Sequence, residues 1–396
     1  MDRHPPPSSK TWNRRIAILA GICLLALFFV TTTKLDHKGQ FKGVFLLKGD
    51  RGHLFVLTDD LYLGEGEQLI AGLDLEDIRI AAAGLPGRHG KGDSYLYYGW
   101  NEKEGTGYVR SYLPDGRRLQ TCFSRFSEGG MHDHGVFIGG GLPSSVSLSD
   151  PKRLNETGMS YFDGSNWNHI WCTTNEGIAV GSSFKMVPAY SWKFLGSKAE
   201  GVGEKFLKLM SRHEVLADGV PLSIDRSAYF RAGDPYFILV VKVKNIGARA
   251  ARFLYCYGDE PWVGNYGTAS GNVGWVDDGL VDCEQWVDTS RHSYAGFFDC
   301  GAPGSGHRYS MAANFIEWIG GRKPSVYFSN GPTEAPGEGG IKRSLDSNEK
   351  FIGVEWGPDV LQPRESTQYA MAIGMAYVDP KTGRPVKPEI NANYIR

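Results

Sequence analysis

Two carboxylate–tryptophan pairs are the residues of this sequence best suited to acid/base chemistry. Asp259 and Glu260 end an apolar run and are followed by Trp262, and Glu355 and Trp356 repeat the pairing in a later apolar run. A carboxyl group beside an aromatic ring suits a sugar, because the carboxyl moves a proton while the ring packs on the sugar face. If the two runs are converging strands, Glu260 or Asp259 and Glu355 would be the acid and the base. An acidic turn at the end of a strand is the alternative for Asp259 and Glu260.

A histidine pair is the next candidate, in the Gly-rich stretch GGMHDHGVFIGGGLPSS (129–145), which we expect to be a long loop. Residues two apart in an extended segment point the same way, so His132 and His134 could act on one ligand. We expect proton transfer or sugar contact, with a solvated loop as the alternative. A metal site would need a third ligand from far along the chain, for example His169, Glu176 or Asp163.

Acidic residues are crowded into one short segment, which contains Asp277, Asp278, Asp282, Glu284 and Asp288. Oxygen ligands at this density could hold Ca²⁺, but the spacing is not that of an EF-hand. A solvated acidic loop is favoured. We therefore predict no cofactor and keep Asp277, Asp278 and Asp282 as the weak candidates for a calcium site.

Aromatic residues are spread among Gly-rich turns: Trp262, Tyr266, Trp275, Trp286, Trp318, Tyr327 and Trp356. Rings exposed in such loops can pack against sugars, although we expect over half of them to fill the core. The candidates for substrate contact are Trp262, Tyr266, Trp275 and Trp356, together with His169.

The composition bounds the class of protein. The 396 residues include 43 Lys and Arg against 44 Asp and Glu, so no strong positive field is available for nucleic acid. Gly accounts for 52 residues, nearly twice its average share of roughly 7%. This favours short strands and tight turns over helical bundles. No phosphate-binding loop, dinucleotide-binding fingerprint, HExxH motif or GxSxG elbow occurs.

Strand patterns run through most of the chain. Residues 43–58 predict a hairpin around a Lys-Gly-Asp-Arg-Gly turn. Residues 228–258 predict a pair of strands that is joined at Ile246-Gly247-Ala248. Residues 199–219 allow one short helix, because Phe206, Leu207, Met210 and His213 fall near helical spacing.

The amino terminus predicts a membrane anchor. Residues 16–30 are fifteen apolar positions without a charge, and with Thr31 to Thr33 they would form a helix of roughly 27 Å. Four cations precede the run and Thr-Thr-Thr is a poor cleavage site, so a retained anchor is favoured over a cleaved signal. We expect a cytoplasmic tail at 1–15, an anchor at 16–33, and a periplasmic or extracellular remainder.

Cysteines leave the redox state open. Outside the apolar run lie Cys122, Cys172, Cys256, Cys283 and Cys300, an odd number without a CxxC spacing. At least one of these thiols is free or pairs between chains, and the sequence does not fix their pairing.

Two runs resemble a known superfamily. DPYFILVVKVKNIGARAARFLYCYGDEPW (234–262) resembles the segment of galactose-mutarotase-like β-supersandwich proteins in which a strand, an Asn with a small residue, and a second strand lead into the sugar site. FIGVEWGPDVLQPRESTQYAMAIGMAY (351–377) is similar to their closing pattern, in which a strand delivers a Glu to the pocket before a Pro-x-Glu-Ser turn and a final strand. The superfamily includes sugar epimerases, polysaccharide lyases, glucan-biogenesis proteins and noncatalytic domains of glycoside hydrolases. The resemblance therefore implies a carbohydrate ligand without fixing the reaction.

The resemblance assigns one residue and leaves one open. Glu355 matches the carboxylate that takes a proton from the anomeric hydroxyl in mutarotases. The pattern also places a His at the strand exit, but residues 255–260 contain none. Asp259 or Glu260 would have to replace it, which speaks against simple aldose mutarotation.

Together these observations predict a mostly β protein, a large antiparallel β-supersandwich that follows one transmembrane helix. Residues 40–150 form an N-terminal β-rich part and 151–396 the mutarotase-like part, with one joint domain as the alternative. We expect a membrane-anchored carbohydrate-active protein of hydrolase, epimerase or lyase type. The alternative is a noncatalytic glycan-binding or envelope-polysaccharide biogenesis protein. The expected partners are a carbohydrate and the membrane, without nucleic acid, and the oligomeric state is open.

Overall fold

The computed structural model describes short strands between residues 34 and 79, most of residues 92–124, strand β10 and most of residues 158–395. The gaps in the last range are 163–166, 265–268, 301–311, 332–342, 348–349 and a few single residues. The chain divides into two compact units, Met1–Leu69 and Ile70–Arg396. The expected division between residues 150 and 151 lies inside the second unit, where strands from both sides of it pair with each other.

The first unit contains five described strands. β1 (Lys34–Leu35), β2 (Gln40–Lys42) and β5 (Leu61–Tyr62) form one antiparallel sheet, and β3 (Val44–Lys48) pairs with β4 (Leu54–Thr58). The β3–β4 pair confirms the hairpin predicted at 43–58. Residues 16–33, the predicted anchor, lie outside the described residues. No helix in the described part of the chain is long and apolar enough to cross a membrane.

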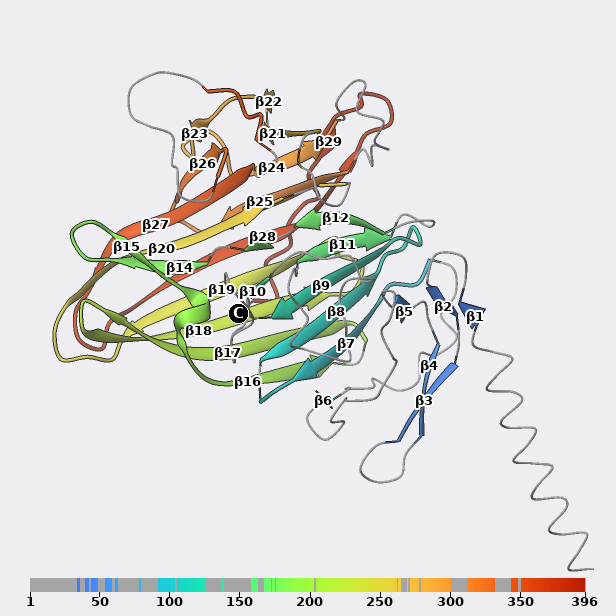
Figure 1. Ribbon diagram of the computed structural model, residues 1–396, viewed down its shortest axis with the longest axis horizontal. Helices are drawn as coiled ribbons and strands as arrows, with labels where there is room; N and C mark the ends of the chain where they lie inside the picture. The colour runs from blue at the N-terminus through green and yellow to red at the C-terminus, as the bar shows by residue number, and fades with distance from the viewer. Residues whose placement is uncertain are drawn as a thin grey trace, which may run out of the picture. The chain divides into compact units, whose positions relative to one another are not determined.

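The second unit is built from three antiparallel sheets (Figure 1). Sheet 1 has the order β12-β11-β9-β8-β7-β6, with β10 beside β9. Its strands are β6 (Ile78–Arg79), β7 (Tyr95–Asn101), β8 (Thr106–Tyr112), β9 (Arg118–Ser124), β10 (Phe137–Ile138), β11 (Met159–Phe162) and β12 (Trp167–Trp171).

Sheet 2 has the order β15-β14-β20-β27-β26-β23, with β13 beside β20. Its strands are β13 (Thr173–Thr174), β14 (Gly177–Val180), β15 (Lys185–Pro188), β20 (Ala251–Glu260), β23 (Gln285–Val287), β26 (Ser325–Ser329) and β27 (Phe351–Leu361). A single turn of 3₁₀ helix, η2 (Ala189–Ser191), follows β15 and is the one helical element in the described residues.

Sheet 3 has the order β16-β17-β18-β19-β28-β25-β24-β21-β22, with β29 beside β28. Its strands are β16 (Lys193–Val202), β17 (Phe206–Ala217), β18 (Val220–Arg231), β19 (Tyr236–Asn245), β21 (Asn272–Val276), β22 (Gly279–Val281), β24 (Tyr294–Asp299), β25 (Ala313–Ile319), β28 (Ser366–Val378) and β29 (Pro385–Val386). The mostly β, antiparallel architecture that we predicted is therefore confirmed.

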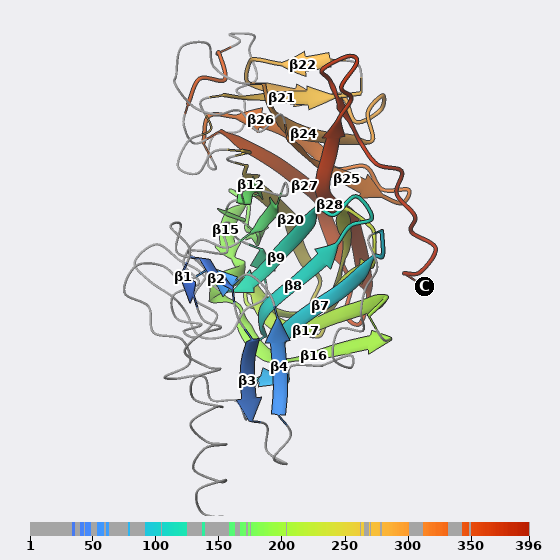
Figure 2. The same ribbon diagram turned by 90° about the vertical axis from the view of Figure 1, so that its right-hand side faces the viewer.

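Sheets 1 and 2 cover the same face of sheet 3. Phe123 of sheet 1 meets Phe230 and Phe237 of sheet 3 edge to face, at ring-centroid distances of 5.9 and 6.0 Å. Tyr255 of sheet 2 stacks on Tyr369 of sheet 3 at 4.9 Å. The sheet 3 residues in these contacts lie on one face, and the main apolar core fills the space between the layers. The outer faces of sheets 1 and 2 therefore look to the same side of the unit (Figure 2).

The link between β19 and β20 corrects one prediction. Both strands and the turn between them form at the predicted positions, but the strands do not pair with each other. β19 pairs with β18 and β28 in sheet 3, while β20 pairs with β14 and β27 in sheet 2. Asn245 fixes the crossing, because its side chain donates to the carbonyls of Arg249 and Leu361 and accepts from the Gly247 amide.

The short helix predicted within 199–219 was wrong. These residues belong to β16 and β17, which pair with each other from Lys193↔Glu214 to Val202↔Phe206. Leu207 and Leu209 are buried while the residues between and beside them are less so, which is the period of two that a strand requires. The helical spacing of four side chains was a coincidence that strand pairing overrode.

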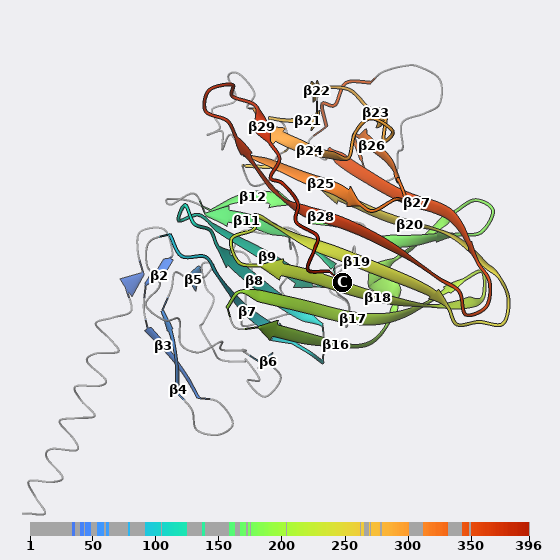
Figure 3. The ribbon, with the colours of Figure 1, turned by 180° about the vertical axis from the view of Figure 1, so that it is seen from behind.

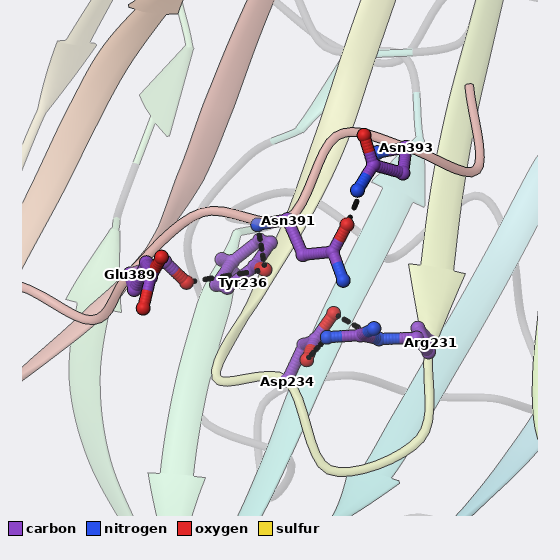
Figure 4. A network of polar contacts seen from close by, with 6 residues as sticks. All are labelled: Arg231, Asp234, Tyr236, Glu389, Asn391 and Asn393. Atoms are coloured by element: carbon purple, nitrogen blue, oxygen red, sulfur yellow. Dashed lines mark hydrogen bonds and ion pairs between the residues drawn. The ribbon is translucent and has the colours of Figure 1, made fainter. Parts of the chain in front are cut away.

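The outer face of sheet 3 has its own apolar cover. The chain after β29 crosses this face past β28 and β19 (Figure 3), and Ile390 and Tyr394 pack on a second apolar cluster there. The Tyr236 hydroxyl accepts a hydrogen bond from the Asn391 amide, and Arg231 pairs with Asp234 (Figure 4). The Arg231 guanidinium also lies over the Tyr394 ring. Both faces of sheet 3 are thus covered, whereas sheets 1 and 2 each have one face turned away from the core.

Candidate functional site

Glu355 lies in the middle of the outer face of sheet 2. It is opposite Cys256 of β20 and Ser325 of β26, and the same row continues from Cys256 to Gly177 of β14. Side chains alternate along a strand, so the neighbours of Glu355 on β27 point into the core while its own carboxyl points outward. The carboxyl is half-buried. The other residues of this row, Gly177, Cys256 and Ser325, are small and uncharged, so Glu355 is the one acidic residue among them.

Burial and one hydrogen bond set the acidity of this carboxyl. Burial raises the pKa of Glu355 above its ordinary value, and a hydrogen bond from Tyr327 opposes that shift. Burial, with the nearby Glu355 charge as the next cause, raises the pKa of Cys256 to about 12 and also raises the pKa of Tyr327. Both neighbours are therefore protonated at neutral pH. Of the three groups, Glu355 is thus the one that loses its proton most readily.

Two glycines next to Glu355 make room for aromatic rings. A Cβ atom at Gly353 would overlap the Tyr327 ring, and one at Gly258 would overlap the Phe351 ring. The two glycines face each other across β20 and β27, so both rings lie over bare backbone. The glycines therefore hold the rings down on the sheet surface beside the carboxyl.

An aromatic row extends from this point to the edge of the sheet. Tyr327 lies 6.4 Å from Phe351 and 5.0 Å from Trp286, measured between ring centroids. Trp286 lies on edge strand β23, opposite Tyr327, and is 43% exposed. The sequence included Trp286 and Tyr327 among its aromatic residues but missed Phe351, whose role depends on the glycine that it faces across the sheet.

Glu260 shares the outer face with Glu355 but lies further along it. It is four residues beyond Cys256, which places the two glutamates about 13 Å apart along the strand direction. The Phe351 ring over Gly258 lies between these two positions. Asp259 pairs through its backbone with Ile352 and Thr174, and its side chain is outside the described part.

Trp356 and Trp275 do not offer a ring to a ligand. Trp356 is 1% exposed and packs at 5.8 Å from Tyr255 in the core. Trp275 is 2% exposed and donates its indole N–H to the carbonyl of Asn314. This corrects the predicted pairing of Glu355 with Trp356, because successive residues of a strand point to opposite faces. The ring that accompanies Glu355 is Tyr327.

Several predicted residues lie outside the described part of the chain: His132, His134, Trp262, Tyr266, Asp163 and Asp278. His169 is described through its backbone only, which pairs with Ser160 in sheet 1. These roles stay predictions.

The predicted metal ligands that the structure describes have other contacts. Asp277 lies 3.4 Å from the His292 ring, and the Asp282 carbonyl accepts from the Leu345 amide. Glu176 is fully buried in an ion pair with Arg226. This contact does not fit the predicted role of Glu176 as a third metal ligand. Among the described residues, no group of three or more His, Cys, Asp or Glu is arranged to hold a metal ion.

The four cysteines that the structure describes are free thiols: Cys122, Cys256, Cys283 and Cys300. Cys172 lies outside the described residues.

Known proteins give a limited comparison. No protein-family model matches the chain, and no curated protein matches it. Solved structures do match, among them a protein of Klebsiella pneumoniae assigned as an aldose 1-epimerase, with 10% identity and a TM-score of 0.39 over 72% of this chain and 84% of that one. A galactose mutarotase-like protein of Clostridium acetobutylicum matches with 10% identity and a TM-score of 0.37 over 72% of this chain and 98% of that one.

Galactose-mutarotase-like proteins are thus among the matches, as the sequence resemblance predicted. A GH36 α-galactosidase of Geobacillus stearothermophilus also matches, with 9% identity and a TM-score of 0.36 over 71% of this chain. The match spans only 40% of that enzyme. With TM-scores this low, we infer the chemistry of the site from sheet 2 itself.

Proposed function

We propose that the chain binds a carbohydrate on the outer face of sheet 2 and transfers a proton to or from it through Glu355. The observation that carries this proposal is a half-buried carboxyl of raised pKa, hydrogen-bonded by Tyr327 and set beside an aromatic row. A carboxyl whose pKa is raised toward the working pH can both accept and return a proton. The Trp286 ring at the open end of the row supplies an apolar surface for a sugar face. This proton transfer requires no cofactor.

The spacing of the carboxyl groups favours a reaction that uses one carboxylate. Hydrolysis by paired carboxylates needs them about 5–5.5 Å apart in retaining enzymes and about 6.5–9.5 Å apart in inverting enzymes. Glu260 lies about 13 Å along the strand direction from Glu355. Epimerisation or elimination, in which one base removes a proton and another group returns one, fits this spacing better. His132 and His134 are our candidates for the second group.

Trp286 gives the test of binding. Replacing Trp286 with Ala should weaken binding of the recognised oligosaccharide about tenfold, because the exposed ring is lost while the sheet is kept. The measurement is titration calorimetry on the full chain, after a glycan array has found the ligand. The Leu280→Ala variant is the control, since Leu280 is exposed on β22 of sheet 3. Equal binding by the wild type and the Trp286→Ala variant would contradict the proposed position of the sugar.

A noncatalytic glycan-binding protein is the second candidate function. One observation favours it: Tyr327 and Cys256, the described groups next to Glu355, have raised pKa values and therefore keep their protons. If no proton-transfer partner is supplied, the face could bind a sugar without changing it. Binding that survives the Glu355→Gln substitution, with no turnover by the wild type, would favour this candidate.

We also propose that residues 16–33 anchor the chain in a membrane and that the residues after them are extracytoplasmic. The support is the uncharged apolar run with Arg14 and Arg15 before it. The full chain should remain in the membrane pellet after a carbonate wash, and its large second unit should be cut by protease added to spheroplasts. Release by the wash, or protection from the protease, would contradict the anchor or its orientation.

A further inference from the structure

Four turns of sheets 2 and 3 meet at one end of the second unit, at the left of Figure 1. They join β14 to β15, β17 to β18, β19 to β20 and β27 to β28. Oδ1 of Asp218 in the second turn lies 3.5 Å from the position that a Cβ atom at Gly181 of the first turn would take. The Asn245 carbonyl, where the third turn begins, accepts a hydrogen bond from the Arg364 amide of the fourth. We call the exposed residues in and next to these turns the turn surface: Lys185, Leu216, Ile246, Arg249, Arg252, Val360 and Arg364.

Large apolar side chains are exposed on the turn surface. Leu216 is 62% exposed and Ile246 is 44% exposed. Both lie next to Pro221, which pairs with Leu216 in register and accepts the Ile246 amide at its carbonyl. Val360 is 55% exposed at the same end of the unit, on β27 opposite Arg252. Single exposed apolar residues are normal on a protein surface, but three of them at one end of a unit indicate a contact surface.

Cations accompany these apolar side chains. Four of them are exposed on the turn surface: Lys185, Arg249, Arg252 and Arg364. None of the four forms an ion pair with a residue that the structure describes. The carboxylates within the four turns are Asp218 and Glu365, so four cations against two anions leave an excess of two positive charges. Their charge is therefore available to an anionic partner.

Two of the turns hold a large side chain where glycine would be the unstrained residue. Phe184 and Arg364 have φ angles of 47° and 73°, in the left-handed region that residues with bulky side chains rarely adopt. The Phe184 ring lies under the Arg252 guanidinium, at 4.8 Å from its Cζ atom. Strain of this kind is retained mainly where the side chain has a function. An aromatic ring and a cation thus occupy two turns in spite of their backbone conformation.

We propose that the turn surface docks on a lipid bilayer that carries anionic headgroups. Apolar side chains on turns can enter the boundary between headgroups and acyl chains, while the neighbouring Lys and Arg side chains contact lipid phosphates. A protein partner fits less well, because the centre of a protein interface is depleted of charged residues. On the turn surface Val360 is paired with Arg252, and Ile246 shares a turn with Arg249. This docking is independent of sugar binding and of any chemistry at Glu355.

The test is hydrogen exchange, followed by mass spectrometry, on the full chain in two kinds of vesicle. One kind contains equal parts of phosphatidylcholine and phosphatidylglycerol, and the other contains phosphatidylcholine alone. The amides of residues 246–250 should exchange about tenfold more slowly in the anionic vesicles than in the neutral ones.

The turn at 114–117 is the internal control. Arg117 of this turn lies over the Tyr377 ring, near the end of β28 that is far from the turn surface. Its amides should exchange equally in both kinds of vesicle. Because residues 16–33 are present in both, their own binding to lipid cannot produce a difference between the two turns.

Two substitutions test the two kinds of side chain. Arg249→Gln should reduce the slowing about threefold or more, because each cation near an anionic surface adds to the attraction. Ile246→Ser should reduce it by a similar factor, because it removes an apolar side chain from the boundary. The matched controls are Arg384→Gln and Val386→Ser, which change exposed residues beside the far end of β28. Both should leave the slowing unchanged.

Two results would overturn the proposal. Equal exchange of residues 246–250 in both kinds of vesicle would exclude an anionic bilayer and leave a protein partner as the occupant. Equal effects of Arg249→Gln and Arg384→Gln would reduce the slowing to net charge. If thermal melting shows that Arg249→Gln does not fold, Arg364→Gln replaces it with the same expected loss. Release of the chain by a carbonate wash would count against the anchor alone, because the difference between the two kinds of vesicle does not depend on it.

Discussion

Replacing Glu355 with Gln should lower turnover of the recognised carbohydrate about 10²–10⁴-fold while the protein stays folded. The amide has the shape of the carboxyl but cannot take a proton, so the loss should appear in kcat more than in KM. Glu355 is half-buried on the outer face and is not part of the core, so its replacement should change the melting temperature little. Glu260→Gln is the comparison, and we expect a much smaller loss because Glu260 lies further along the strand.

The pH profile gives an independent check on the same residue. Burial raises the pKa of Glu355, so a reaction that uses its carboxylate as base should rise with pH through a value above that of an ordinary glutamate. The hydrogen bond from Tyr327 stabilises the charged form and lowers this pKa. Tyr327→Phe removes the hydrogen bond and should therefore move the acidic limb of kcat to higher pH. A limb that does not move, or an active Glu355→Gln variant, would exclude Glu355 as the base.

Replacing Arg226 with Met should destabilise the fold by about 3–5 kcal/mol, because it leaves a buried carboxylate without its partner. Arg226 and Glu176 have 2% and 0% of their side chains exposed, and Nη2 of Arg226 lies 2.7 Å from Oε2 of Glu176. Tyr255 also donates to Glu176, at 2.8 Å. The double variant Glu176→Gln, Arg226→Met should recover most of the loss, because no unpaired charge remains. Urea unfolding monitored by tryptophan fluorescence measures both.

The pH dependence of that variant follows from the carboxyl. Burial raises the pKa of Glu176 and the charge of Arg226 opposes the shift, so removal of Arg226 should raise this pKa further. A carboxyl with a raised folded-state pKa binds its proton more tightly in the folded protein than in the unfolded chain. Stability is therefore lost as pH rises from the unfolded-state pKa toward the folded-state pKa. The Arg226→Met variant should be less destabilised at about pH 5 than at about pH 8. An equal loss at both pH values, also present in the double variant, would assign the effect to packing alone.

Local sequence pattern was sufficient for the strands. The alternating run at 237–245 forms β19. The run at 351–377, which resembles the closing pattern of the superfamily, begins with β27, and Glu355 lies on that strand as expected. The composition predicted the mostly β class correctly, because a high Gly content and the scarcity of helix patterns can be seen without knowing which strands pair. The short helix predicted within 199–219 rested on a coincidental spacing of apolar residues, and such short runs cannot be assigned by period alone.

The partners of those strands could not be predicted in the same way. Cys256 lies 99 residues before Glu355 in the chain and Ser325 lies 30 residues before it, so no local pattern encodes the pairing that places both beside Glu355. The same holds for β19 and β20, which read as one hairpin and are divided between two sheets. Trp356 was assigned to the wrong face because adjacency in sequence was taken as adjacency in space, whereas alternation along a strand separates neighbours.

The most direct test of the central claim is a crystal structure of the full chain with the oligosaccharide that the glycan array selects. The sugar should lie on the outer face of sheet 2, with a hydroxyl within hydrogen-bonding distance of Glu355 and a ring face against Trp286. An oligosaccharide bound only elsewhere on the protein, with Glu355 in contact with none of its atoms, would contradict the role that we assign to this carboxyl.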